Sequence, residues 1–428
     1  MTPIEYPRVG ETLCRQKLPN GLEVVTVSKP YHAKSYAFFA VRYGGMDLRF
    51  CQNGSWQDTP AGIAHYLEHK MFEMEEGNVM VDFARNGASD NAFTSAAMTA
   101  YYFTSTSHFY ENLRTLLRFV STPYFTQESV AKEQGIIAQE IQETEDDPDW
   151  RVYANLMECL YAKSPVRIPV VGSLESIRQI TPQTLYDCHK AFYTPSNMVL
   201  VCVGSVDPQR VVAEASAVLP QEGGPDIGRD YGEGESLAPV KSEAVQSMEV
   251  AMPMFLAGYK CCPQSGGDAV LRQSIIGDIA CDALFGDSSP LYTRLYEEGA
   301  INSSLGGNFD MLPGADYVYV GGDAKDPRRV FHEITTQAQK LAAEGIDEAF
   351  YQQIRRAAYG GMLRSLNSLE NIAISAAEGY FRGFDYFRFP EIFDTVTKSD
   401  VEAFLRENFT PERAALSMIQ PLTQGGQA

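Results

Sequence analysis

The chain has 428 residues, a formal net charge of −20 at pH 7 and an apolar content of 44%. This length allows two or three domains with buried cores, and the composition is typical of a globular protein. The negative charge argues against a nucleic-acid partner, because phosphates would be repelled, and it disfavours an anionic membrane surface. A basic peptide substrate is compatible with this charge, although most of the acids are expected on the solvated surface.

Eight cysteines are spread through the chain without Cys-x-x-Cys spacing. Several lie in apolar runs such as Val201-Cys202-Val203, which indicates buried free thiols in a reducing compartment. The first residues show no apolar segment typical of a secretory signal, and no apolar run approaches the roughly 20 residues that span a bilayer. We therefore expect a cytoplasmic protein.

The pentapeptide His65-Tyr66-Leu67-Glu68-His69 uses two of only six histidines. Residues i and i+4 share a helix face, so His65 and His69 could bind one metal ion, and zinc accepts histidine nitrogens. Glu68 lies on nearly the same face, where its carboxylate could take a proton from an activated water. The spacing His-x-x-Glu-His is the inverted zincin motif. The alternative interpretation is an amphipathic helix whose histidines are satisfied by hydrogen bonds within the core.

A short strand is expected over Asn91-Ala92-Phe93-Thr94, with Gly87 just before it. If this strand lies at the edge of a sheet, an extended peptide could add to it through backbone hydrogen bonds. Asn91 and Ala92 are therefore candidate substrate-binding residues. The alternative is an ordinary sheet strand.

A helix is expected from Thr126 to about Glu145, and Pro148 lies just beyond its end. Its apolar stripe comprises Val130, Ile136, Ile137 and Ile141. A catalytic zinc usually takes three protein ligands, so a third should come from another element. The spacing leaves Glu133, Glu140 and Glu143 as equal candidates, and the alternative is a solvated acidic face.

The motif, followed by Glu133 and Glu140, resembles the pitrilysin family of inverzincin metallopeptidases. That family includes insulysin and the mitochondrial processing peptidase. The resemblance implies a zinc peptidase in which His65, His69 and Glu140 hold the metal. It implies that Glu68 is the general base and that Glu133 is a supporting acid beside the ligands.

The resemblance extends over essentially the whole chain. Residues Gly87–Ser95 and Thr99–Tyr102 resemble the family's substrate-side strands, which implies a substrate role for the first of them. Three other segments resemble a bacterial branch associated with aminopentanone modification of elongation factor P and with bacteriocin maturation. These segments are Lys132–Glu140, Pro148–Arg151 and Met252–Phe255.

An internal repeat divides the chain. Residues 180–195 align without gaps on 396–411, and an apolar strand follows each, over Met198–Val203 and Ala414–Ile419. A polar stretch over residues 220–246 indicates a linker between a metal-bearing domain at 1–219 and a homologous domain at 247–428. Other expected elements are the strands Leu22–Ser28, Ser35–Tyr43 and Met248–Tyr259 and a helix near Leu271–Phe285.

This alternation of helices and strands predicts an α+β fold of two homologous sandwiches, each with helices on a mostly antiparallel sheet. The repeat offset of 216 residues places Cys281, Leu284 and Phe285 where the first half has its motif. The second half is therefore expected to lack a zinc site.

The resemblance also bears on partners. Large family members close two such halves as a clam shell, whereas this chain resembles one half only. A second half-shell is implied, either a homologous subunit without the zinc motif or a second copy of the chain. In the family the second shell often supplies an arginine and a tyrosine, and Asp316-Tyr317-Val318-Tyr319 lacks the arginine, which favours the heterodimer. The rival hypothesis is a non-catalytic or accessory subunit in a protein or peptide modification pathway.

Overall fold

The computed structural model describes residues 2–422, and its contacts divide the chain into two compact units. Neither unit is one continuous stretch of sequence. The first comprises Met1–Ile141, Pro169–Asp230 and Met362–Pro390, and the second comprises Gln142–Ile168, Tyr231–Gly361 and Glu391–Ala428. No helix within residues 2–422 combines the length and the apolar character needed to cross a bilayer.

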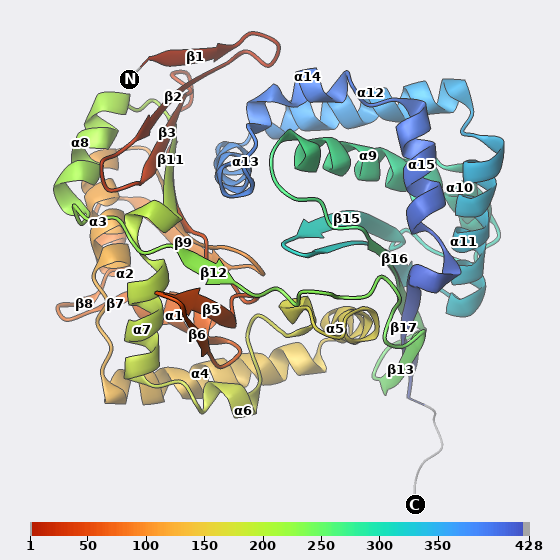
Figure 1. Cartoon of the computed structure of the whole chain (residues 1–428), viewed down its shortest axis with the longest axis horizontal. Coiled ribbons are helices and arrows are strands. Elements are labelled where there is room, and N and C mark those ends of the chain that lie inside the picture. Colours follow the sequence, from red (N-terminus) through yellow and green to blue (C-terminus); the bar gives the residue numbers. More distant parts are fainter. Residues whose placement is uncertain (1, 423–428) are drawn as a thin grey trace, which may run out of the picture. The chain divides into compact units, whose positions relative to one another are not determined.

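The first unit is built on a seven-stranded sheet in the order β1-β2-β3-β11-β4-β10-β9. Figure 1 labels five of these strands, β1, β2, β3, β11 and β9. All neighbouring strands are antiparallel except β3 and β11. The strands are β1 Pro3–Tyr6, β2 Glu11–Lys17, β3 Glu23–Ser28, β4 Ser35–Val41, β9 Ala88–Thr94, β10 Thr99–Ser105 and β11 Met198–Gly204.

Helices cover both faces of this sheet. The central strands β4 and β11 are buried along their whole length, which requires apolar cover on each face. One cover is α13 (Leu369–Arg382), which packs on β4 and β11 from far along the chain. The remaining helices of this unit are α1 Ile63–Met71, α2 Met80–Arg85, α3 Phe109–Ser121, α6 Leu174–Ile177, α7 Pro182–Phe192, α8 Pro208–Val218 and most of α4 Gln127–Asp146, which continues into the second unit after Ile141.

Two small sheets also belong to the first unit. One has the order β12-β5-β6 and the other pairs β7 with β8. Their bounds are β5 Arg49–Gln52, β6 Ser55–Asp58, β7 Glu73–Met74, β8 Gly77–Asn78 and β12 Ile227–Arg229. The polar stretch 220–246, expected as a linker, thus contributes a strand to this unit.

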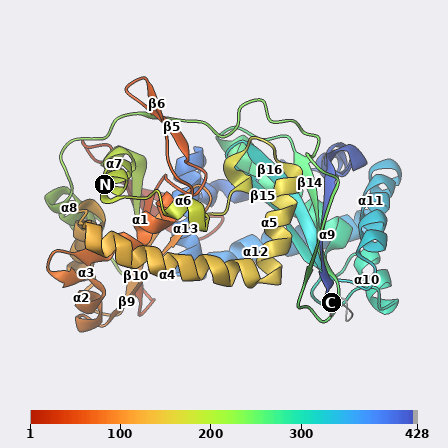
Figure 2. The same cartoon turned by 90° about the horizontal axis from the view of Figure 1, so that it is seen from below.

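The second unit has a five-stranded sheet in the order β13-β17-β14-β16-β15, with β13 parallel to β17. Figures 1 and 2 show α5 (Pro148–Leu160) against this sheet, where it packs on β14 and β17. The strands are β13 Glu243–Met248, β14 Met254–Cys261, β15 Gly306–Leu312, β16 Ala315–Asp323 and β17 Ala414–Pro421. The other helices are α9 Asp268–Phe285, α10 Pro290–Glu297, α11 Pro327–Glu344, α12 Glu348–Ser365, α14 Phe389–Phe393 and α15 Lys398–Asn408.

The predicted repeat has the same local structure in both halves. Thr181 and Thr397 each form a capping box at the start of a helix, α7 and α15. A single 3-10 turn at Pro195 or Pro411 then leads into β11 or β17. Each of these strands lies between a parallel and an antiparallel neighbour. The predicted α+β fold of two related, mostly antiparallel sheets is therefore confirmed.

Two sequence predictions of local structure were wrong. The strand expected over Met248–Tyr259 is two strands, because the chain leaves the sheet after Met248 and returns at Met254. Pro253, which has no backbone N–H to donate, lies in that break. Ile136 was assigned to the apolar stripe of α4, but its side chain is 48% exposed. The eight cysteines are free thiols as predicted, but only five are buried, since Cys14 and Cys51 are half-buried and Cys262 is exposed.

Candidate metal centre

Helix α1 starts where two backbone segments come into close contact. Gly62, at the N-cap, has φ of 89°, a conformation that favours glycine. A Cβ there would lie 2.6 Å from the carbonyl oxygen of Val171, so a side chain would push the segments apart. This contact fixes the start of the helix, and therefore the direction in which the motif side chains project.

The motif residues share one largely buried face of α1. The rings of His65 and His69 have centroids 4.5 Å apart, as expected for positions one helical turn apart. His65 and Glu68 are each 8% exposed. The three polar side chains are thus largely removed from water, and they require hydrogen-bond or ionic partners within the protein.

Helix α4 supplies those partners. The Oε1 of Glu140 lies 3.4 Å from His65 Nε2, and its Oε2 lies 3.7 Å from His69 Nε2. Glu133, two turns earlier, has its Oε1 3.0 Å from His69 Nδ1. Thr126 begins this helix as expected, because its Oγ1 accepts a hydrogen bond from the Ser129 N–H. Of the three acids that the sequence left equal, the structure brings two to the histidines.

The donor set fits zinc. One ligand atom from each of His65, His69 and Glu140 lies within 4.8 Å of the other two. Tetrahedral ligands at zinc distances are about 3.3 Å apart, close to the two carboxylate–imidazole separations. Two imidazoles and one carboxylate also leave a fourth position open, as in a catalytic site. Within residues 2–422 this is the one such group of histidine, cysteine and acidic side chains.

Glu133 occupies the place of a supporting carboxylate. With Nε2 of His69 turned toward Glu140, the other ring nitrogen can donate its proton to Glu133. Such a contact fixes the tautomer and the orientation of a ligating imidazole. The hydrogen bond to His69 lowers the pKa of Glu133, despite burial, and thus keeps it anionic.

Glu68 lies near both histidines, but its hydrogen bond comes from Thr94. Burial raises its pKa, although the nearby His65 and a hydrogen bond from Thr94 Oγ1 at 2.8 Å favour the charged form. The hydrogen bond to His65 lowers the pKa of Glu140, by contrast. The pKa of Glu68 is therefore raised and the pKa of Glu140 is lowered. Such a difference between two neighbouring carboxylates is common in active sites where one binds a metal ion and the other exchanges protons.

Two contacts that the sequence did not predict tie α1 to the first turn of α4. The hydroxyl of Tyr66 donates to the carbonyl oxygen of Val130. Lys70 is fully buried, with its Nζ 2.5 Å from Glu73 and 3.4 Å from the carbonyl oxygen of Ser129. A buried cation beside a ligand is costly unless it is paired, so the burial indicates a positioning role.

We expect Lys70→Met to weaken zinc binding roughly tenfold, the usual size of an effect next to metal ligands. The substitution preserves the apolar stem but removes the donor to α4, so the spacing between the histidines and Glu140 is less well held. Competition with a chelating dye measures the affinity. Lys132→Met, at an exposed position of α4, is the matched control, and equal affinities of the two variants would contradict the positioning role.

The expected strand 91–94 lies within β9, which ends the sheet among the described residues. The N–H of Ala92 donates to Oδ1 of Asn91 at 2.9 Å. Thr94, at the end of the same strand, donates to Glu68. The end of the edge strand β9 is therefore in direct contact with Glu68.

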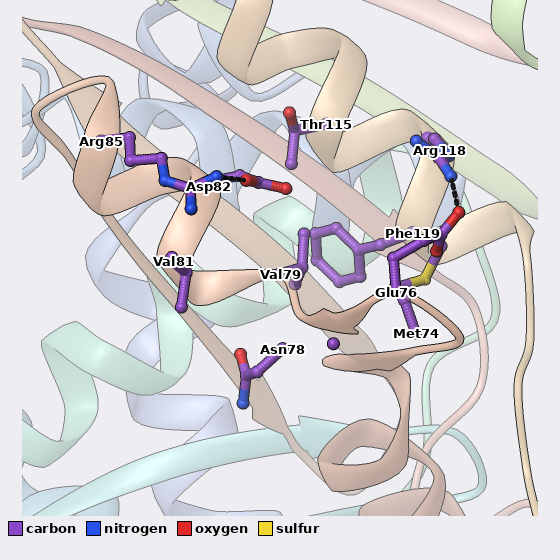
Figure 3. Close-up of a pocket in the computed structure, with 11 residues that line it drawn as sticks. Met74, Glu76, Asn78, Val79, Val81, Asp82, Arg85, Thr115, Arg118 and Phe119 are labelled. Atoms are coloured by element: carbon purple, nitrogen blue, oxygen red, sulfur yellow. Dashed lines mark hydrogen bonds and ion pairs between the residues drawn. The ribbon is translucent and has the colours of Figure 1, made fainter.

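A pocket of about 370 Å³ lies beyond the motif helix, between the β7–β8 hairpin, α2 and α3 (Figure 3). Its two arginines are paired, Arg85 with Asp82 at 3.2 Å and Arg118 with Glu76 at 2.7 Å. It contains no residue of the metal centre. This pocket is therefore separate from the candidate metal centre.

The second unit has apolar side chains at the corresponding positions. Cys281, Leu284 and Phe285 lie in α9 and are buried. Helix α9 packs on β15 and α15, as α1 packs on β9 and α7. The face that carries the candidate ligands in one unit is thus part of a hydrophobic core in the other.

Two family models match the chain. Residues 50–173 match insulinase, peptidase family M16, and residues 179–358 match the peptidase M16 inactive domain. The chain is 38% identical over 425 residues to the zinc protease YmfH of Bacillus subtilis (strain 168), which covers 98% of this chain and 99% of that protein.

Solved structures show the same fold. An M16-like peptidase from Alicyclobacillus acidocaldarius has a TM-score of 0.93 and 34% identity, covering 98% of this chain and 100% of the other. A protease from Helicobacter pylori has a TM-score of 0.81 at 19% identity, covering 96% and 99%. The sequence and fold together show that this chain belongs to M16, the insulinase family of peptidases.

Proposed function

We propose that the protein is a zinc-dependent endopeptidase. The observation that carries this proposal is the convergence of His65, His69 and Glu140 from two helices, with Glu68 beside them and hydrogen-bonded to Thr94. The names of its relatives support it, since YmfH is called a zinc protease. Held by these three ligands, zinc would supply Lewis-acid activation of water and of a peptide carbonyl.

Glu68 would act as the general base and then as the acid. Its carboxylate would take a proton from the attacking water and pass it to the leaving amine. Burial raises the pKa of Glu68, which makes it a stronger base than an exposed glutamate. Thr94 would hold the carboxylate in place through its hydrogen bond, and Glu133 would orient His69.

The substrate would add to the edge of β9 as an extended strand. This places the peptide beside Asn91 and Ala92 and leads it toward Glu68 through Thr94. The Ala92 N–H donates a hydrogen bond to the side chain of Asn91. This hydrogen bond would have to break before the same N–H could donate to the backbone of the substrate. Backbone pairing would confer little sequence preference, because side-chain pockets set specificity in this mode.

We further propose that a second half-shell completes the enzyme in the cytoplasm. A heterodimer with a homologous subunit lacking the zinc motif is favoured over a homodimer, because no arginine accompanies the tyrosines over Asp316–Tyr319. The match of residues 179–358 to a domain described as inactive favours a second candidate, an accessory subunit that binds without cleaving.

Zinc-dependent cleavage of a peptide mixture tests the proposal. Zinc-loaded protein, alone and with its co-purified partner, is incubated with tryptic peptides of casein, and new termini are identified by mass spectrometry. We expect new termini that disappear with a chelator and return when zinc is added. Full zinc occupancy without new termini in either preparation would favour the accessory subunit.

A further inference from the structure

A groove of about 600 Å³ opens in the second unit, beside the first turn of α5. This volume suits a short peptide segment or a small ligand. Two segments that resemble the bacterial branch meet here, since Pro148 and Asp149 of one and Met252, Met254 and Phe255 of the other contribute to its lining. The other lining residues are Val152, Val250, Ala251, Leu256, Ser304, Gly321, Gly322 and Asp323. None of them belongs to the metal centre.

The floor of the groove is apolar and only partly covered. Val152 and Met254 are buried with Ile419 in a small cluster, against which Val250 and Leu256 pack. The connection from β13 to β14 adds Ala251, which is exposed, and Met252, which is half-buried. Methionine side chains adapt to irregular apolar partners. The floor can therefore accept an aliphatic side chain from outside.

The rim of the groove is acidic. Asp149 and Asp323 both line it, and no lysine or arginine does. Asp323 accepts from Asn302 Nδ2 at 3.0 Å, which leaves its other oxygen available. Neither carboxylate forms an ion pair with any residue in the 2–422 range. The groove thus offers unpaired negative charge next to an apolar surface, and a cationic group would satisfy it.

We propose that this groove binds an extended segment of a partner protein in which an aliphatic side chain stands next to lysine or arginine. Charge complementarity favours a foreign segment over a second copy, because this chain has a net charge of −20. The inference does not depend on the proposed peptidase activity, since the groove and the metal centre share no residue.

The chain contains a reporter for this binding. Trp150 follows Asp149 in α5 and is half-buried, with the Arg151 guanidinium 5.5 Å from its ring centroid. There are two tryptophans, so Trp56→Phe leaves Trp150 as the single source of indole fluorescence. The probe is the peptide acetyl-Gly-Leu-Lys-Met-Lys-Gly-amide. We expect a saturable change in fluorescence, and none with the same peptide carrying glutamate in place of lysine.

Substitution of the two rim carboxylates tests whether the peptide binds in this groove. In the Trp56→Phe background, Asp149→Asn combined with Asp323→Asn should weaken the Kd roughly tenfold or more, as the loss of charged contacts does. Glu249→Gln, an exposed acid of the same connection that does not line the groove, should leave the Kd unchanged. Binding should also persist after treatment with a chelator, so loss of peptidase activity alone would leave this inference standing.

Five results would overturn the inference, and the first four concern the peptide. They are the absence of a saturable signal, equal binding of the glutamate peptide, an unchanged Kd in the double variant, and loss of binding when the metal is removed. The last would place the peptide at the metal centre. Self-association of the wild type that the double variant abolishes, measured by sedimentation, would assign the groove to a second copy and would also reject the proposed partner.

Discussion

Replacing Glu68 with glutamine is expected to abolish peptide hydrolysis while the protein keeps its zinc. The amide has nearly the shape of the carboxylate and can still bond to Thr94, but it cannot accept a proton from water. A general base contributes about a hundredfold to ten-thousandfold, so the turnover should fall by at least the lower figure. Release of new termini from the casein peptides and metal analysis of the same preparation give the two readouts.

The matched control is Glu75→Gln, which removes the same charge from an exposed residue in the hairpin after α1. It should preserve both activity and metal content. Normal turnover by the Glu68→Gln variant would show that another group takes the proton. Loss of both turnover and zinc would mean that Glu68 supports the metal itself.

The metal content of a Glu140→Gln variant is expected to fall far below that of the wild type, for which we expect about one zinc per chain. An amide is a much weaker ligand than a carboxylate, and the two histidines alone leave the site one ligand short. An ion that binds only the folded protein stabilises it, so the variant should also lose the rise in melting temperature that zinc gives the wild type.

Glu143→Gln is the control for this experiment. It lies on the same helix and is exposed, and it does not belong to the group of three possible ligands. Mass spectrometry under native conditions counts the bound ion directly. If Glu143→Gln lost zinc and Glu140→Gln kept it, the choice between these two acids would be reversed. A wild type that remains metal-free after zinc is supplied would make the centre a relic or dependent on a partner.

The parts of the site that follow from helical periodicity were predictable from the sequence. His65, Glu68 and His69 lie on one face because their spacing requires it, and the seven-residue interval from Glu133 to Glu140 repeats a helix face. Periodicity could not choose among three acids on α4, because that choice depends on how α4 packs against α1. The resemblance to a known family made the choice, and the structure places the same two acids at the histidines.

Other features depend on tertiary contacts that leave no local pattern. Lys70 looks in the sequence like an ordinary lysine near a helix end, and its burial and its contact with Ser129 depend on tertiary packing. Thr94 lay within a segment already attributed to the substrate side, yet its bond to Glu68 could not be inferred. The break before Met254 was missed because four of the five residues over Met248–Met252 are apolar, which looks like a continuous strand, and Pro253 was not given its weight as a strand breaker.

The packing of α5 and α13 has a consequence for biosynthesis. Helix α5 belongs to the first half of the sequence but covers β14 and β17, whereas α13 belongs to the second half and covers β4 and β11. The two repeats have in effect exchanged helices. As the chain leaves the ribosome, the sheet that presents the metal helix therefore lacks one of its covers until Arg382 has been made. At least 382 residues must therefore be translated before this sheet can close, and until then its apolar strands would be open to chaperones that bind such surfaces.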